Sequence, residues 1–88
     1  MDMHQEKARD PRTVCICYLA AYLIVVESCI AQEALLIARQ NVDRRPVDKI
    51  MGVQDSLAVL AMFVPGKTIT TADEIRILEV GSELLAKA

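Results

Sequence analysis

The chain has 88 residues, of which 53% are hydrophobic and 25% charged, and its formal net charge is −2. A chain of this length provides for one domain, because two smaller units would each bury too little surface to be stable. A slightly acidic chain also argues against binding that depends on neutralising phosphates, so we expect no nucleic acid partner. Its richness in alanine, leucine, isoleucine and valine, with few aromatic residues, favours an all-α fold.

Residues 1–9 are polar, of mixed charge and without hydrophobic periodicity. Such a segment predicts a flexible N-terminal arm. The remaining residues, 10–88, are expected to form a single helical domain.

The first predicted element is a long central helix over about residues 11–40. Asp10 is a favoured N-cap, and Pro11 suits the first helical position because it needs no amide partner there. From Val14 to Val26 every residue is apolar or a tyrosine, and apolar spacing continues beyond this run. Two apolar faces run along this helix, so we expect the other helices to pack along it.

The second predicted element is a shorter helix over about residues 46–64, with Pro46 at its start. Gly52 lies inside the apolar pattern, either as a close helix contact or as a point where the helix breaks and restarts near Asp55. Pro65 and Gly66 end the element. Spacings of three and four residues indicate a helical seam made of Ile50, Val53, Leu57, Leu60 and Val64.

A third helix is predicted over about residues 71–87. Thr71 and Glu74 form a T-x-x-E capping box, which marks the start of the helix. Ile75 and Leu78 belong to its apolar line, whereas residues such as Glu79 are expected to face water.

The segment Ala61–Thr68 matches the relaxed phosphate-binding pattern A-x-x-x-x-G-K-T. That chemistry requires a strand, a loop whose amides wrap a phosphate, and a helix that begins at the lysine and threonine. Here a helical seam precedes the pattern and the next helix begins only at Thr71. We therefore interpret Pro65–Thr68 as a helix stop and expect no cofactor.

Groups suited to catalysis or metal binding are sparse. Cys15 and Cys17 are two residues apart on a predicted helix and point to nearly opposite sides, so they cannot share a metal ion. We interpret these two and Cys29 as three buried thiols in a reducing cytoplasm. His4, the single histidine, lies in the arm, away from any nucleophile. We expect no enzyme, no metal site and no small-molecule substrate.

Basic residues gather around the first interhelical turn. We interpret them as a solvated corner with local ion pairs, and the alternative is an electrostatic rim for an acidic protein partner. These residues are Arg39, Arg44, Arg45 and Lys49.

The predicted helix lengths imply an uncovered apolar surface. At about 1.5 Å per residue, neither shorter helix reaches the first turns of the central one. Such a surface exceeds what monomers usually expose, so we expect a homodimer and, in addition, a contact with another protein. The expected interface residues are Val14, Cys15, Tyr18, Leu19, Tyr22, Val25, Cys29 and Leu36.

These features predict a small regulatory protein of the cytoplasm. It would act as an anti-activator or adaptor that occupies the helical dimerisation surface of a partner, for example a transcription factor. One alternative is a small membrane-anchored or peripheral membrane protein, although Glu27 and Glu33 interrupt the apolar run before it reaches the ~20 residues that a span needs. Another is a DNA-binding dimer, which would show a steep salt dependence.

Overall fold

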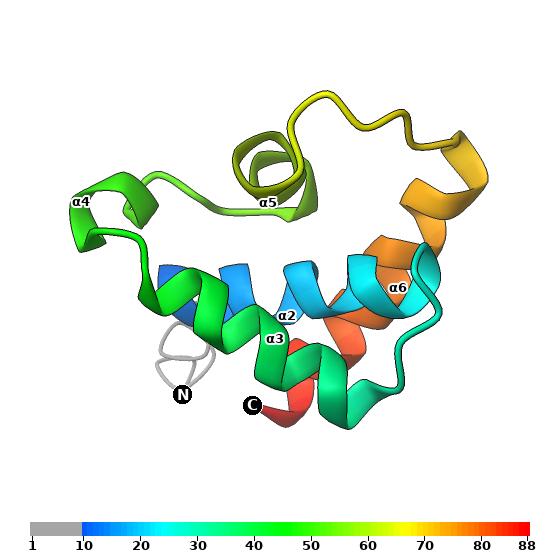
Figure 1. Ribbon diagram of the computed structural model, residues 1–88, viewed down its shortest axis with the longest axis horizontal. Coiled ribbons are helices and arrows are strands. Elements are labelled where there is room, and N and C mark those ends of the chain that lie inside the picture. Colours follow the sequence, from blue (N-terminus) through cyan, green and yellow to red (C-terminus); the bar gives the residue numbers. More distant parts are fainter. Residues whose placement is uncertain (1–9) are drawn as a thin grey trace, which may run out of the picture.

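The computed structural model describes residues 10–88, and within that range the chain is helical and has no strand. This confirms the predicted all-α fold class. The flexible arm predicted over residues 1–9 lies outside the described residues. The helices, shown in Figure 1, are α2 (Pro11–Val25), α3 (Ala31–Asp43), α4 (Val47–Ile50), α5 (Ser56–Phe63) and α6 (Thr71–Lys87).

Helix α2 is the centre of the fold, because it contacts each of the other four helices. In Figure 1 it runs between α3 and α5, with α6 packed along its C-terminal half. From Val14 to Tyr22 every side chain except that of Ile16 is buried. A helix that is apolar on all sides is stable in water only when all its sides are covered, and this is the position that α2 occupies.

The prediction of one long helix over residues 11–40 is wrong, because α2 ends at Val25 and the chain reverses direction before α3. Ser28 adopts a left-handed backbone conformation with φ of 60°. The carbonyl of Leu23 accepts a hydrogen bond from the amide of Cys29 at 3.0 Å, which closes the turn. The segment contains neither glycine nor proline, so no local signal in the sequence marked the reversal.

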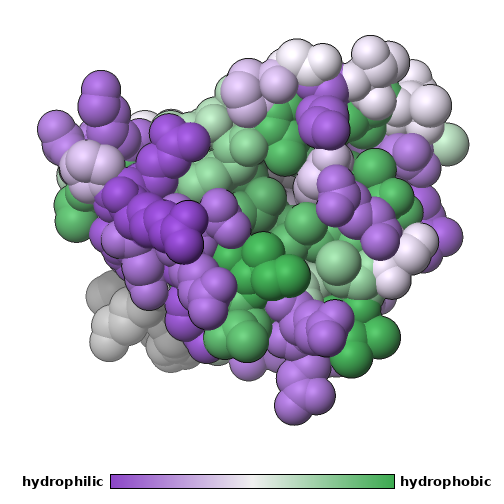
Figure 2. Space-filling view, in the orientation of Figure 1, coloured by the Kyte–Doolittle hydropathy of each residue, from purple (hydrophilic) through white to green (hydrophobic). Residues whose placement is uncertain are grey.

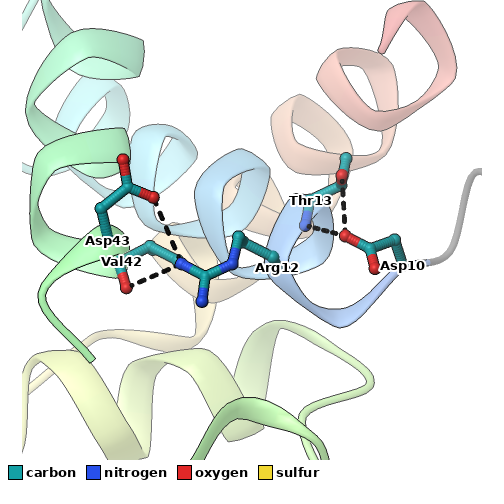
Figure 3. Close-up of polar contacts among 5 residues, drawn as sticks. All are labelled: Asp10, Arg12, Thr13, Val42 and Asp43. Atoms are coloured by element: carbon teal, nitrogen blue, oxygen red, sulfur yellow. Dashed lines mark hydrogen bonds and ion pairs between the residues drawn. The ribbon is translucent and has the colours of Figure 1, made fainter. Parts of the chain in front are cut away.

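Polar contacts hold the start of α2 against the end of α3 (Figure 3). The Arg12 guanidinium donates to the carbonyl oxygen of Val42 and forms an ion pair with Asp43, both at 3.2 Å. The Asp10 carboxylate accepts from the amide of Thr13 at 3.2 Å, which confirms the predicted N-cap. The two helices are therefore antiparallel neighbours.

Small side chains account for the close packing of α3 on α2. Among the described helices α3 contacts only α2, so its buried residues Ala34, Ala38 and Val42 must face that helix. On α2, Ala20 and Ala21 are likewise fully buried. The distance between two packed helices depends on the side chains at their contact, and alanine allows a short one.

The second predicted helix, over residues 46–64, is divided into α4 and α5. Gly52 lies in the turn between them, and Asp55 caps α5 by accepting from the amide of Ala58 at 3.0 Å. One of the two alternatives for Gly52, a break with a restart near Asp55, is thereby confirmed. Ile50 and Val53, which lie on either side of this break, are both buried in the hydrophobic core.

The third predicted helix, over residues 71–87, is confirmed as α6 with the same bounds. Its capping residue differs from the prediction. Thr70 rather than Thr71 is the N-cap, and its hydroxyl accepts from the amide of Asp73 at 3.1 Å. A threonine therefore caps the helix as predicted, but it is the residue one position earlier in the chain.

We expect the reversal between α2 and α3 to be measurable as a short distance between spin labels at positions 13 and 44. A continuous helix would separate Thr13 and Arg44 by about 46 Å. The antiparallel pair places them at about 20 Å or less, because neighbouring helix axes are 8–10 Å apart. Labels on Thr13→Cys and Arg44→Cys, in a Cys29→Ser background, can be measured by double electron–electron resonance. A distance distribution centred near the long value would contradict the reversal.

We expect Gly81→Ala to destabilise the protein. A methyl group at this position would overlap the ring of Tyr18, which is itself buried. Overpacking costs about 1–3 kcal/mol, which exceeds the gain of about 1 kcal/mol in helix propensity.

The measurement is urea unfolding followed by circular dichroism. Gly52→Ala is the matched control, since nothing lies within 4 Å of the added carbon there. A Gly81→Ala protein as stable as the parent would show that α6 does not pack on Tyr18 in this way.

Candidate functional site

Most of the predicted interface residues are part of the internal core. The prediction that they form an exposed surface is wrong for five of them, whose exposed fractions are 6% or less. The cause is the reversal after α2, which lets α3 and α6 cover the turns that were expected to lack a partner. These residues are Val14, Cys15, Tyr18, Leu19 and Tyr22.

The other three predicted interface residues lie nearer the surface. Val25 and Cys29 are half-buried, and Leu36 is 55% exposed. The helical neighbours of Leu36, three and four residues away, include the exposed polar residues Glu33 and Gln40. A single exposed leucine in polar surroundings is ordinary for a protein surface. Its role at an interface stays a prediction.

An apolar groove lies between α3 and α5, and we call it the α3–α5 groove. Both helices pack on α2 but not on each other, which leaves a hollow with α2 as its floor. The hollow has a volume of about 170 Å³. Figure 2 shows hydrophobic side chains across the middle of this face, with hydrophilic ones on both sides. The lining residues are Leu19, Tyr22, Leu23, Glu27, Ile37, Asn41, Phe63, Val64 and Lys67.

Helix geometry explains which side of α3 borders the groove. Ala34 and Ala38 face α2, so Ile37 and Asn41, which are three residues further along, lie at the edge of that contact. Ile37 is 38% exposed. Only two groove residues, Leu19 and Tyr22, were among those predicted from the sequence. The others were missed because the groove exists only after α3 has folded back.

Charged and polar groups surround this apolar surface. The Tyr22 hydroxyl donates to the Glu27 carboxylate at 3.4 Å, and burial, followed by the nearby negative charge of Glu27, raises the pKa of Tyr22. The Arg45 guanidinium lies 4.9 Å from the centre of the Phe63 ring. It also donates to the carbonyl oxygen of Met62 at 3.4 Å. Among the residues of the predicted basic corner, Arg45 thus contacts Phe63, which lines the groove.

Within the segment that matches a phosphate-binding pattern, Pro65–Thr68 is a helix stop, as predicted. Helix α5 precedes it, Gly66 has φ of 80°, and the next helix begins at Thr71. The amide of Lys67 donates to the carbonyl of Val64 at 3.4 Å and is thus directed into the turn. Within the described range no strand precedes this loop, so the geometry that wraps a phosphate is missing there.

Two features of the described residues bear on the other functional classes. No helix in residues 10–88 is long and apolar enough to cross a membrane. In the same range, no three histidine, cysteine, aspartate or glutamate side chains are grouped as they would be around a metal ion.

Comparison with known proteins gives no match: no family model fits the chain, and neither a curated protein nor a solved structure resembles it significantly. A proposal about function therefore depends on the α3–α5 groove itself.

We expect the stability of the protein to fall at alkaline pH. Burial raises the pKa of the Cys15 thiol from 9.0 to about 11, although Arg12 acts in the opposite direction. The unfolded chain therefore loses this proton at a lower pH than the folded one. The free energy of unfolding is unaffected below about pH 9 and decreases between about pH 9 and 11. Burial raises the pKa of Cys17 too, with the same sign.

Urea unfolding across this pH range provides the measurement. Cys15→Ala is expected to reduce the alkaline decrease relative to the parent. Equal slopes for Cys15→Ala and the parent would show that this thiol is not the group responsible.

Proposed function

We propose that this protein is a non-enzymatic interaction module whose α3–α5 groove binds an amphipathic helix of a partner protein. The observation that carries the proposal is an apolar hollow between two helices that do not touch each other, with a third helix as its floor. A docked helix would complete the packing around α2. Recognition of this kind uses apolar anchors spaced three or four residues apart on the bound helix.

The size of the hollow supports a helix rather than a small molecule. Ligand pockets usually measure about 300–1,000 Å³, whereas this one measures about 170 Å³. A hollow of this volume has room for one anchoring side chain of the bound helix. The half-buried Phe63 and the exposed Ile37 on opposite sides supply apolar surface for the neighbouring turns of the bound helix.

As a biological role, we propose that the protein acts as a regulatory anti-activator or adaptor. By taking up a helix that a transcription factor needs for its own dimerisation, it would withhold that helix from its usual contact. We place the protein in the cytoplasm, where the free thiols Cys15, Cys17 and Cys29 would stay reduced.

We include the homodimer predicted from the sequence in the same proposal, but with a different contact surface. The turns of α2 that were expected to form the dimer contact are covered within one chain. The α3–α5 groove is an apolar surface to which a second copy could contribute a helix.

We expect Ile37→Asp to abolish helix binding while Leu36→Asp leaves it intact. The two residues are adjacent, but Ile37 lines the groove and Leu36 faces solvent beside polar neighbours. A carboxylate placed against the bound apolar face lacks a partner, which weakens binding at least about tenfold.

The probe is a displayed library of amphipathic helical peptides of about 18 residues, selected against the parent protein. Affinities of recovered peptides follow from fluorescence anisotropy, and thermal unfolding shows whether each variant is folded. Failure to recover any peptide, or equal losses with both variants, would overturn the proposal.

A further inference from the structure

The outer face of α6 carries features that match the α3–α5 groove. Ile75 and Leu78 are 52% and 41% exposed although both are large and apolar. They are three residues apart and so lie side by side on the helix. Glu79 flanks this pair, and its carboxylate forms an ion pair with Arg76 at 4.0 Å in which both side chains are 65% exposed. Helix α6 carries four acidic and two basic side chains, so this exposed apolar pair belongs to an amphipathic helix of net negative charge.

The rim of the groove has the opposite charge. The exposed Lys67 lines the groove, and the exposed Arg45 lies over the ring of Phe63, which lines it too. Glu27 is the one carboxylate among the lining residues. Within residues 10–88 no acidic side chain forms an ion pair with either cation, whereas Arg12 is paired with Asp43. The rim is therefore locally basic in a chain whose net charge is −2.

Helix α6 does not reach the groove of its own molecule. It packs on α2 and α5, and it makes no contact with α3, which forms one wall of the groove. In Figure 1 its first turns stand at the end of the molecule beyond α5. A copy of this face can enter the groove only from another molecule.

We propose that the protein forms a twofold dimer in which α6 of each copy lies in the α3–α5 groove of the other. Ile75 and Leu78 provide the apolar anchors, and Glu79 lies towards the basic rim formed by Arg45 and Lys67. Twofold symmetry makes the two contacts identical. The inference rests on the proposed function, since it uses the same groove. It also implies that partner binding and self-association compete.

The first experiment is sedimentation velocity on the full chain over a dilution series. The parent protein shows a reversible monomer–dimer equilibrium. Ile37→Asp in the groove and Leu78→Asp on α6 each raise the dimer dissociation constant at least about tenfold, because each leaves a carboxylate facing apolar surface. Leu36→Asp is the matched control and dimerises like the parent. Thermal unfolding confirms that the variants are folded.

Mixing the two dimerisation-deficient variants distinguishes this contact from others. The Ile37→Asp variant retains an intact α6, and the Leu78→Asp variant retains an intact groove. In the mixture, the first variant therefore places its α6 in the groove of the second, which gives a heterodimer with one of the two contacts. A contact of groove with groove would be insensitive to Leu78→Asp, and that result would overturn the inference. So would a parent protein that stays monomeric at every concentration.

A charge exchange tests the orientation of the flanking residues. Lys67→Glu and Glu79→Lys each weaken the dimer, and their combination restores it, because the ion pair is re-formed with its signs reversed. Lys87→Glu, an exposed position in the last turn of the same helix, serves as the control for a general change in charge. Two weakening substitutions that remain additive when combined would show that Lys67 and Glu79 do not meet.

The peptides recovered with the parent protein separate this inference from the proposed function. Peptides that bind the groove and dissociate the dimer support both. A monomeric protein that still binds them overturns the α6 contact and leaves the proposed function in place. A protein that dimerises through α6 but binds no peptide overturns the proposed function and leaves the dimer.

Discussion

The need to cover α2 on every side is the constraint on which the rest of the structure depends. Its buried residues occupy successive positions from Cys17 to Tyr22, so no face of the helix is suited to water. An isolated helix of this composition would expose all of that surface. The other helices are arranged around α2 and make few contacts with one another. The core is consequently a single layer of side chains around one helix.

This arrangement explains why the chain reverses after Val25. Had the first helix continued, its second half would have extended beyond the other helices and left apolar surface on both parts in water. Folding α3 back buries Ala34 and Ala38 against α2, and the Arg12 contacts with α3 hold the two helix ends together. The left-handed conformation at Ser28 costs about 1–2 kcal/mol, which the burial of several side chains can offset.

The same arrangement creates the candidate site. Helices α3 and α5 each cover part of α2 without meeting, and the interval between them leaves Leu23 half-buried at the floor. Arg45 connects the two walls through the Phe63 ring and the Met62 carbonyl. The proposed partner helix and the proposed α6 contact follow from one physical feature, a central helix whose last turn, at Leu23, is only half-buried beside a basic edge. Because both contacts use the same groove, dimerisation at high protein concentration would leave fewer grooves free to bind a partner helix.

Local features of the sequence determined the fold class and most helix ends. Asp10 at the start of α2, Asp55 at the restart after Gly52, and the run of α6 over residues 71–87 all act within one or two turns of the chain. Helix caps and hydrophobic periodicity depend on residues close together in the chain, so they can be recognised from the sequence alone. The reversal at residues 26–30 is different, because it contains no glycine or proline. Only the tertiary structure decided it, along with the burial of Tyr18 and the existence of the groove. The reason is that these features depend on how much apolar surface distant segments bury against each other, a quantity that no local pattern encodes.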